Sequence, residues 1–209
     1  MSPTRRVAVL TVDQRGSRAG TDAVPALLDA LTPASLPAPP LLGFQRTVGD
    51  EVQGVVDDPS TLVEAVGRAL RLQAWNIGIG IGDIEAPLPS ETREGRGPAY
   101  VHAREAVTRA KSAPHHVVVV GAVGDARVEH LETVLGLWAG LLERRTARGW
   151  EVHDLLVEGL SYSAVGKRLG ISQSAVSQRA QAAGIQDEHR ARGLATHLGA
   201  TLLETEEDR

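Results

Sequence analysis

The first 31 residues combine an apolar run with an amphipathic segment. Residues 6–12 are apolar almost throughout, a pattern typical of a strand that is covered on both faces. Residues 21–31 carry apolar side chains at three- and four-residue spacing, which predicts a helix capped by Thr21 or Asp22. We therefore expect the chain to open with a buried strand followed by a helix.

After residue 40 the same two patterns alternate up to residue 121. Extended β-branched stretches indicate strands, and apolar residues at helical spacing indicate helices. The order β-α-β-β-α-β-α-β predicts an α+β fold in which helices cover one antiparallel or mixed sheet, of the ferredoxin-like type. The predicted elements of this part are a hairpin over 44–48 and 52–56, a helix over 59–72, a strand over 76–83, a helix over 99–111 and a strand over 116–120.

The predicted strand 76–83 has an unusual composition. It reads NIGIGIGD, so that isoleucines lie on one face and three glycines on the other. Glycine lowers the stability of a strand, and three in register predict that a helix, a backbone segment or a ligand lies close against that face.

The chain changes character after Gly124. Apolar residues recur at helical spacing from Val128 to Leu142, and arginines follow before Gly149, which predicts one connecting helix over 128–148. We divide the chain into a first domain, 1–124, a connecting and dimerisation helix, 125–148, and an all-α domain, 149–209. The expected seam of a homodimer is the stripe Leu131, Leu135, Trp138 and Leu142.

Residues 155–183, LLVEGLSYSAVGKRLGISQSAVSQRAQAA, predict two short helices over 163–169 and 173–182. Gly170 permits the left-handed backbone of a tight turn, and Ser172 is expected to cap the second helix. Gly166 supplies the small residue that a close helix crossing needs, and apolar residues around the turn anchor it. The segment resembles the helix-turn-helix of bacterial transcription regulators, which implies double-stranded DNA as a partner.

The second of these helices carries the polar side chains expected of a helix that enters a major groove. Lys167 and Arg168 on the first helix are placed to contact phosphates. The alternative is a three-helix packing module whose polar faces are solvated or bind protein. The candidate DNA-binding residues are Lys167, Arg168, Ser172, Gln173, Ser174, Ser177, Gln178 and Arg179.

The net charge of −4 is unevenly distributed along the chain. Residues 1–143 carry 13 basic and 17 acidic side chains, residues 144–192 carry 8 and 5, and residues 193–209 carry 1 and 4. The basic excess is therefore confined to the segment with the two short helices, which is compatible with nucleic-acid contact.

Composition excludes several other classes of function. The chain has no cysteine, so disulfides, thiolate nucleophiles and cysteine-ligated metals are ruled out. Aromatic residues make up 3%, which disfavours base stacking on an aromatic platform. The start of the sequence lacks the apolar run of a signal peptide, and we expect a cytoplasmic protein with no membrane partner.

Two aspartates are the candidate metal ligands. Asp13 ends the first predicted strand and Asp50 lies in the hairpin turn, and these strands are neighbours in a ferredoxin-like sheet. Both carboxylates would then project from one sheet edge, an arrangement that holds Mg²⁺ against a triphosphate. Taken alone, Asp13 is more typical of a helix cap and Asp50 of a turn, and only together do the two favour a metal or phosphate site. Candidate phosphate contacts come from the segment Gln14, Arg15, Gly16, Ser17 and Arg18.

The segments VLTVD, TVGDEVQGV, IGIGIGDI and GPAYVHAREAV, in this order, resemble the SatD-like proteins. The resemblance covers residues 6–121, and the fold of that family is similar to the class III nucleotide cyclase and GGDEF catalytic domains. It implies a nucleotide cyclase-like domain in which Asp13 and Asp50 are metal ligands for a bound nucleotide.

The resemblance also has departures. Class III cyclases carry an Asn and an Arg on the helix that corresponds to residues 97–107. Here Val101 stands near the place of the Asn, and Arg104 stands one position from the place of the Arg. Arg104 is therefore a candidate nucleotide contact, whereas the missing Asn argues against cyclisation but not against hydrolysis.

Three functions follow from these patterns. The first is a transcriptional regulator in which a cyclase-like domain senses a nucleotide with Mg²⁺ and a helix-turn-helix binds DNA. The second is a metal-dependent nucleotide cyclase or phosphohydrolase with an accessory helix-turn-helix. The third is a DNA-binding protein whose first domain only dimerises.

Overall fold

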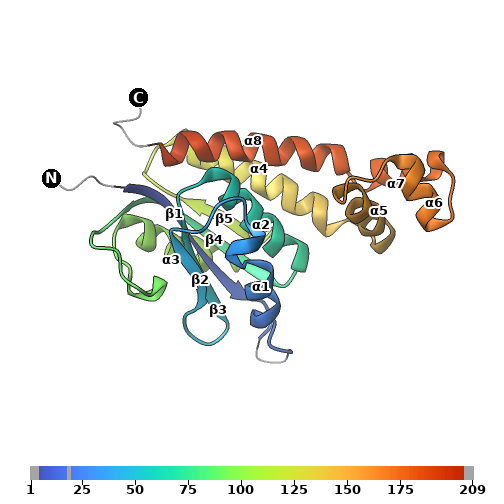
Figure 1. The fold of residues 1–209 in the computed structure, drawn as a ribbon. Helices are drawn as coiled ribbons and strands as arrows, with labels where there is room; N and C mark the ends of the chain where they lie inside the picture. Colours follow the sequence, from blue (N-terminus) through green and yellow to red (C-terminus); the bar gives the residue numbers. More distant parts are fainter. Residues whose placement is uncertain (1–4, 18–19, 205–209) are drawn as a thin grey trace.

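Residues 5–17 and 20–204 are described by a computed structural model, which shows a mixed five-stranded sheet followed by an all-helical region (Figure 1). The strand order is β2-β3-β1-β4-β5. All neighbours are antiparallel except β4 and β5, which are parallel. The strands are β1 (Arg5–Gln14), β2 (Leu42–Arg46), β3 (Glu51–Val56), β4 (Trp75–Ile84) and β5 (Val117–Val120).

Eight α-helices lie in the described part of the chain, and the order of elements up to β5 is the predicted one. The helices are α1 (Val24–Ala30), α2 (Pro59–Leu72), α3 (Pro98–Ala110), α4 (Ala126–Glu143), α5 (Ala147–Val157), α6 (Tyr162–Leu169), α7 (Gln173–Ala182) and α8 (Ile185–Leu203). Short 3₁₀ turns occupy Pro33–Ser35 and Thr92–Glu94.

One face of the sheet holds the main core. Leu10 of β1 lies opposite Ile79 of β4, and alternate residues of both strands are buried beneath α2, α4 and α8. Each such leucine or isoleucine contributes about 1.5 to 3 kcal/mol when fully buried. The burial of β1 on both faces confirms the prediction from its continuous apolar run.

The glycine face of β4 lies directly against the backbone of α3. A Cβ atom at Gly78 would lie 2.2 Å from the backbone nitrogen of Val107, and one at Gly80 would lie 2.1 Å from the carbonyl oxygen of Ala99. The close approach that the three glycines predicted is therefore made by a helix. Larger residues in their place would lift α3 off the sheet.

The first helix begins later than predicted. Ala23 occupies the cap position of α1 and makes no side-chain capping bond. Asp22 still stabilises the helix start, because its carboxylate accepts the backbone N–H of Val24 at 3.0 Å.

The predicted helix 128–148 is broken into two. α4 ends at Glu143, and the Thr146 hydroxyl accepts the N–H of Gly149 at 3.2 Å to start α5.

The predicted dimer seam is also wrong, because that face of α4 packs inside the chain itself. Apolar spacing identifies a buried face but not its partner. The four seam residues, Leu131, Leu135, Trp138 and Leu142, are 0% to 1% exposed within the main core.

The last helix returns to the sheet. α8 lies alongside α4, while α5, α6 and α7 form the end of the molecule farthest from the chain termini (Figure 1). Leu202 is fully buried in the main core, and Arg127 of α4 donates to the carbonyl of Thr201 at 2.7 Å. The division at residues 124 and 148 stays a prediction, but α8 shares its core with residues of the sheet.

Replacing Gly80 by alanine is expected to lower the free energy of unfolding by at least about 1 to 3 kcal/mol, because the new methyl group would overlap the α3 backbone. Gly43→Ala in β2 is the matched control, since a Cβ atom added there would have no atom within 4 Å. Urea denaturation of both variants measures the difference. Equal stability of the two variants would contradict the packing described here.

Candidate functional site

The two predicted helices at residues 162–182 are present and meet at a tight turn. Gly170 ends α6 in the left-handed conformation, with φ of +67°, and the Ser172 hydroxyl accepts the N–H of Ala175 at 3.2 Å to cap α7. A Cβ atom at Gly166 would lie 2.8 Å from the carbonyl oxygen of Ile171, so the turn requires the small residue there. We name α6, the turn and α7 the α6–α7 unit.

A separate small core holds this unit against α5. Val152 of α5, Val165 of α6 and Val176 of α7 are fully buried against one another. Half-buried leucines and isoleucines surround them. Because one face of α7 is committed to this core, its other face is left to solvent.

The solvent face of α7 carries four of the eight candidate DNA-binding residues, namely Gln173, Ser174, Ser177 and Gln178. Arg179 differs from the rest, because it is half-buried. The Ser172 side chain is engaged at the cap and lies 2.9 Å from the Ser174 hydroxyl. The exposed members are Lys167, Arg168, Ser172, Gln173, Ser174, Ser177 and Gln178.

The basic side chains of α6 stand in its last turn. Among the described residues, neither Lys167 nor Arg168 forms an ion pair with an acidic side chain. Cations without a protein partner at an exposed helix end are available to bind phosphate oxygens.

Asp13 lies on the α3 face of the sheet, where it already has two partners. Its Oδ1 is 3.2 Å from the Lys111 ammonium at the end of α3, and its Oδ2 accepts from the Asn76 amide at 3.1 Å. Asn76 Oδ1 lies 3.0 Å from Nδ1 of His116. The carboxylate is thus the centre of a polar network that spans β1, β4 and the ends of α3 and β5.

Asp50 lies beside this network. Its backbone carbonyl accepts the N–H of Gln14 at 3.3 Å, so the hairpin turn meets the end of β1 as predicted. Glu51 pairs directly with Asp13 in the sheet register, and its carboxylate accepts from the Thr47 hydroxyl at 2.6 Å. Asp13, Asp50 and Glu51 therefore occupy adjoining backbone positions where β1 ends and β3 begins.

The candidate phosphate segment has mixed roles. The Gln14 amide donates to the carbonyl of Thr21 at 2.8 Å and accepts from the N–H of Ala23, so it fastens the loop. Arg15 donates to the carbonyl of Gln73 at the end of α2. Gly16 and Ser17 are exposed, and Arg18 lies outside the described residues.

Arg104 is exposed on α3. Seven residues separate it from Lys111, which is about 10 Å along the axis of a helix. Among described residues, no hydrogen bond or ion pair joins Arg104 to Asp13 or Asp50, so the structure does not bring it into the Asp13 network.

Sequence reasoning missed Lys111, Asn76 and His116 as partners of Asp13. The strand register would have revealed Asn76, because residue 13 lies opposite residue 76 in an antiparallel pair. Lys111 has no such signal, since its place depends on where α3 ends over the sheet. His116 was expected to be a strand entry, and it does stand directly before β5.

Asp13 and Asp50 are carboxylates, the side chains that Mg²⁺ takes as ligands in proteins. Among described residues, no three His, Asp or Glu side chains form a group that would hold a metal alone. Mg²⁺ on a nucleotide takes only one or two carboxylates, together with phosphates and water. Asp13 and Asp50 would hold the ion, which would supply charge neutralisation for the phosphates.

A cluster of charges joins the α6–α7 unit to the rest of the molecule. Arg145, with a side chain 0% exposed, lies 2.7 Å from Glu188 of α8, and Glu188 also lies 3.3 Å from His153 of α5. Arg71 of α2 donates two hydrogen bonds of 2.7 Å to Asp154. Burial raises the pKa of Glu188, but the contacts with His153 and Arg145 outweigh it and lower this pKa to about 2.

Comparison of the chain with protein-family models, with curated proteins and with solved structures gave no match. The SatD-like resemblance therefore stays a prediction.

No helix in the described part of the chain has both the length and the apolarity to span a membrane.

Glu188→Gln is expected to lower the free energy of unfolding by about 3 kcal/mol near neutral pH, because it leaves Arg145 buried without its counter-charge. The folded pKa of about 2 is below the ordinary 4.5, so this stabilisation is present above pH 4.5 and is lost as pH falls toward 2. Denaturation of wild type and variant across that range measures the convergence. Asp187→Asn, at an exposed neighbouring position, is the control. A difference independent of pH would contradict the assignment.

Proposed function

We propose that this protein is a DNA-binding transcriptional regulator. The observation that carries the proposal is the α6–α7 unit, with a capped second helix whose apolar face is buried and whose polar face is open. This arrangement supports a helix-turn-helix, in which the second helix enters the major groove. Gln173, Gln178, their serine neighbours and Arg179 would read base edges, while Lys167 and Arg168 would bind phosphates.

We further propose that the first domain is a ferredoxin-like, nucleotide cyclase-like domain. Support comes from the order β2-β3-β1-β4 with antiparallel pairing, to which β5 is added in parallel at the edge. In this proposal Asp13 and Asp50 bind Mg²⁺ on a nucleotide ligand, and the exposed backbone at Gly16 and Ser17 faces its phosphates. We place the protein in the cytoplasm.

The alternative is a metal-dependent nucleotide cyclase or phosphohydrolase with an accessory helix-turn-helix. The same carboxylates would serve it, so the donor set alone does not separate binding from turnover. Product analysis after incubation with Mg²⁺ and each nucleoside triphosphate does separate them. Unchanged nucleotide favours the regulator, and product formation favours the enzyme.

A homodimer remains part of the proposal, because two helix-turn-helix units match a palindromic operator. Since the predicted seam lies inside the chain, the dimer would use outward side chains instead. Leu137 of α4 is 71% exposed and Leu194 of α8 is 49% exposed. These leucines are the apolar residues that α4 and α8 offer to a second copy.

Arg179→Ala is expected to weaken binding to the specific operator by about 1 to 3 kcal/mol, because the guanidinium reads a base. Lys167→Ala should instead weaken all DNA sequences alike and reduce the salt dependence, since its partner is a phosphate. Titration of DNA from upstream of the gene, against an unrelated duplex, measures both. Arg109→Ala on α3 is the control, and equal losses from Arg179→Ala on both duplexes would contradict base reading.

Asp13→Asn and Asp50→Asn should each weaken nucleotide binding in Mg²⁺ at least about tenfold, because each removes a charged ligand at constant size. The double variant should lose little more, since both residues serve one coordination unit. Calorimetry with each nucleoside triphosphate measures these effects, with Asp29→Asn as control. If the wild type binds no nucleotide detectably, Asp13 and Asp50 have only structural roles, as a helix cap and a turn residue.

A further inference from the structure

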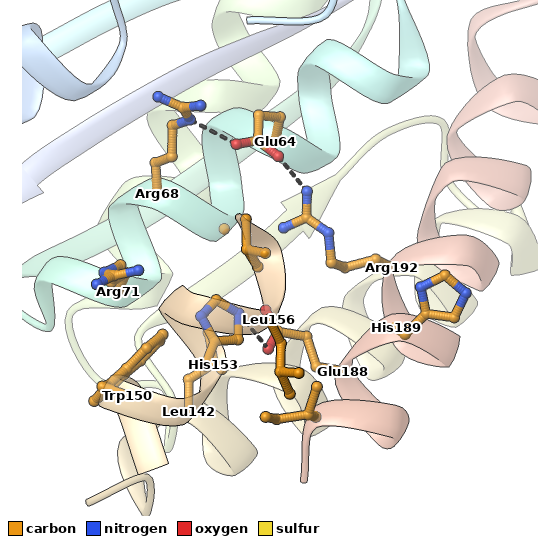
Figure 2. Close-up of a pocket in the computed structure, with 13 residues that line it drawn as sticks. Glu64, Arg68, Arg71, Leu142, Trp150, His153, Leu156, Glu188, His189 and Arg192 are labelled. Carbon is orange, nitrogen blue, oxygen red and sulfur yellow. Dashed lines mark hydrogen bonds and ion pairs between the residues drawn. The ribbon is translucent and has the colours of Figure 1, made fainter. Parts of the chain in front are cut away.

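A cleft of about 380 Å³ lies where α2, α5, α8 and the end of α4 meet (Figure 2). It lies beside the charge cluster that holds the α6–α7 unit to the sheet, not at the Asp13 network. Its volume falls at the small end of the range for ligand pockets, about 300 to 1,000 Å³.

One part of the cleft is apolar. Leu142 at the end of α4, Leu156 on α5 and Ile185 on α8 contribute aliphatic surface, and Trp150 adds an aromatic ring. Val157, 73% exposed, stands at the cleft as well. Together these side chains offer a place for a small apolar body.

Arg192 of α8 supplies the charged part. One of its nitrogens contacts Glu64, and its guanidinium lies 5.2 Å from the centroid of the Trp138 ring. A Cβ atom at Gly67 would lie 2.7 Å from the Trp138 ring and 2.8 Å from Nη1 of Arg192, so a glycine inside α2 makes room for both side chains.

The neighbouring Arg68 and Arg71 each make more hydrogen bonds than Arg192 does. Arg68 donates to Glu64 and to the carbonyls of Ala30 and Ser35. Arg71 makes its bidentate contact with Asp154. Among described residues, Nε and Nη1 of Arg192 make no hydrogen bond, so these two nitrogens remain as donors.

The balance of charge points the same way. Arg145 and Arg71 are matched by Glu188 and Asp154, but Glu64 faces two arginines, Arg68 and Arg192. The part of the cleft around Glu64, Arg68 and Arg192 therefore carries one positive charge in excess. His189 lies one turn before Arg192 on α8 and also lines the cleft.

We infer that this cleft binds a small organic monoacid, with its carboxylate on Arg192 and its apolar body against Leu156, Ile185 and Leu142. An occupant here touches α5, which packs against the α6–α7 unit, and α2, which belongs to the sheet domain. This inference rests on the proposed function: the acid is a second effector, and its binding changes the affinity of the protein for DNA. By linkage, DNA binding changes the affinity for the acid by the same factor.

Calorimetry on the full chain tests the site without DNA. The probes are hexanoate and benzoate, each compared with its neutral amide. We expect at least one of the acids to bind saturably at one site with a Kd below about 10 mM. The Kd of the matching amide should be at least tenfold higher. Arg192→Gln should weaken acid binding at least tenfold by removing the charge, and Val157→Trp should do so by filling the cleft from an exposed position.

Arg190→Gln, an exposed neighbour on α8 that does not line this cleft, is the matched control and should bind like wild type. Absence of saturable binding for both acids, or equal binding in wild type, Arg192→Gln and Val157→Trp, overturns the proposal. If Arg192→Gln fails to fold, Val157→Trp decides alone. Addition of the bound acid to the DNA titration then tests the coupling, and loss of DNA binding itself would refute the proposed function while leaving the calorimetric result in place.

Discussion

The buried ion pair between Arg145 and Glu188 fixes how the two halves of the molecule join. Arg145 follows the end of α4, and Glu188 lies in the first turn of α8, so the pair closes the chain segment that contains α5, α6 and α7. Arg145 also donates to the carbonyl of Ala183 at 2.9 Å, and its guanidinium stacks 4.4 Å from the centroid of Trp150. Removing either charge would leave the other buried without compensation, which costs far more than an exposed pair contributes.

This closure sets the routes by which the sheet could influence the α6–α7 unit. Gln73 ends α2 in the left-handed conformation, accepts from Arg15 of the loop after β1, and donates from its side chain to the carbonyl of Leu142 at 3.0 Å. The end of β1 is thereby connected through one residue to the end of α4. Arg71 adds a second connection, from α2 to α5. Any rotation of α5 together with the α6–α7 unit against the sheet must change the contact between Arg71 and Asp154.

The predictability of the fold follows from how local each signal is. The strands and α2 were predicted closely, because period-two and helical spacing lie within single segments and Asp58 caps α2 directly. The break before Thr146 was missed, since the arginines that follow Leu142 are good helix formers and no glycine or proline stands between Leu142 and Gly149. α8 was not predicted as an element, because its buried face is largely small: Ala195 and Gly199 pack closely but give little hydrophobic signal.

The candidate site was predictable only in part for the same reason. Asp13 could be placed at a strand end from its own segment, but its partner in the fold, Lys111, lies 98 residues away in sequence. A lysine at the end of α3 is favoured by the helix dipole, so its position there has a structural cause independent of any ligand. In the proposed sensor, a bound nucleotide phosphate gives Lys111 a second anionic partner. The phosphate would then compete with the Asp13 carboxylate for Lys111. Without nucleotide, the two side chains stabilise the fold as an ion pair. With nucleotide, Asp13 would bind Mg²⁺ and Lys111 would bind a phosphate.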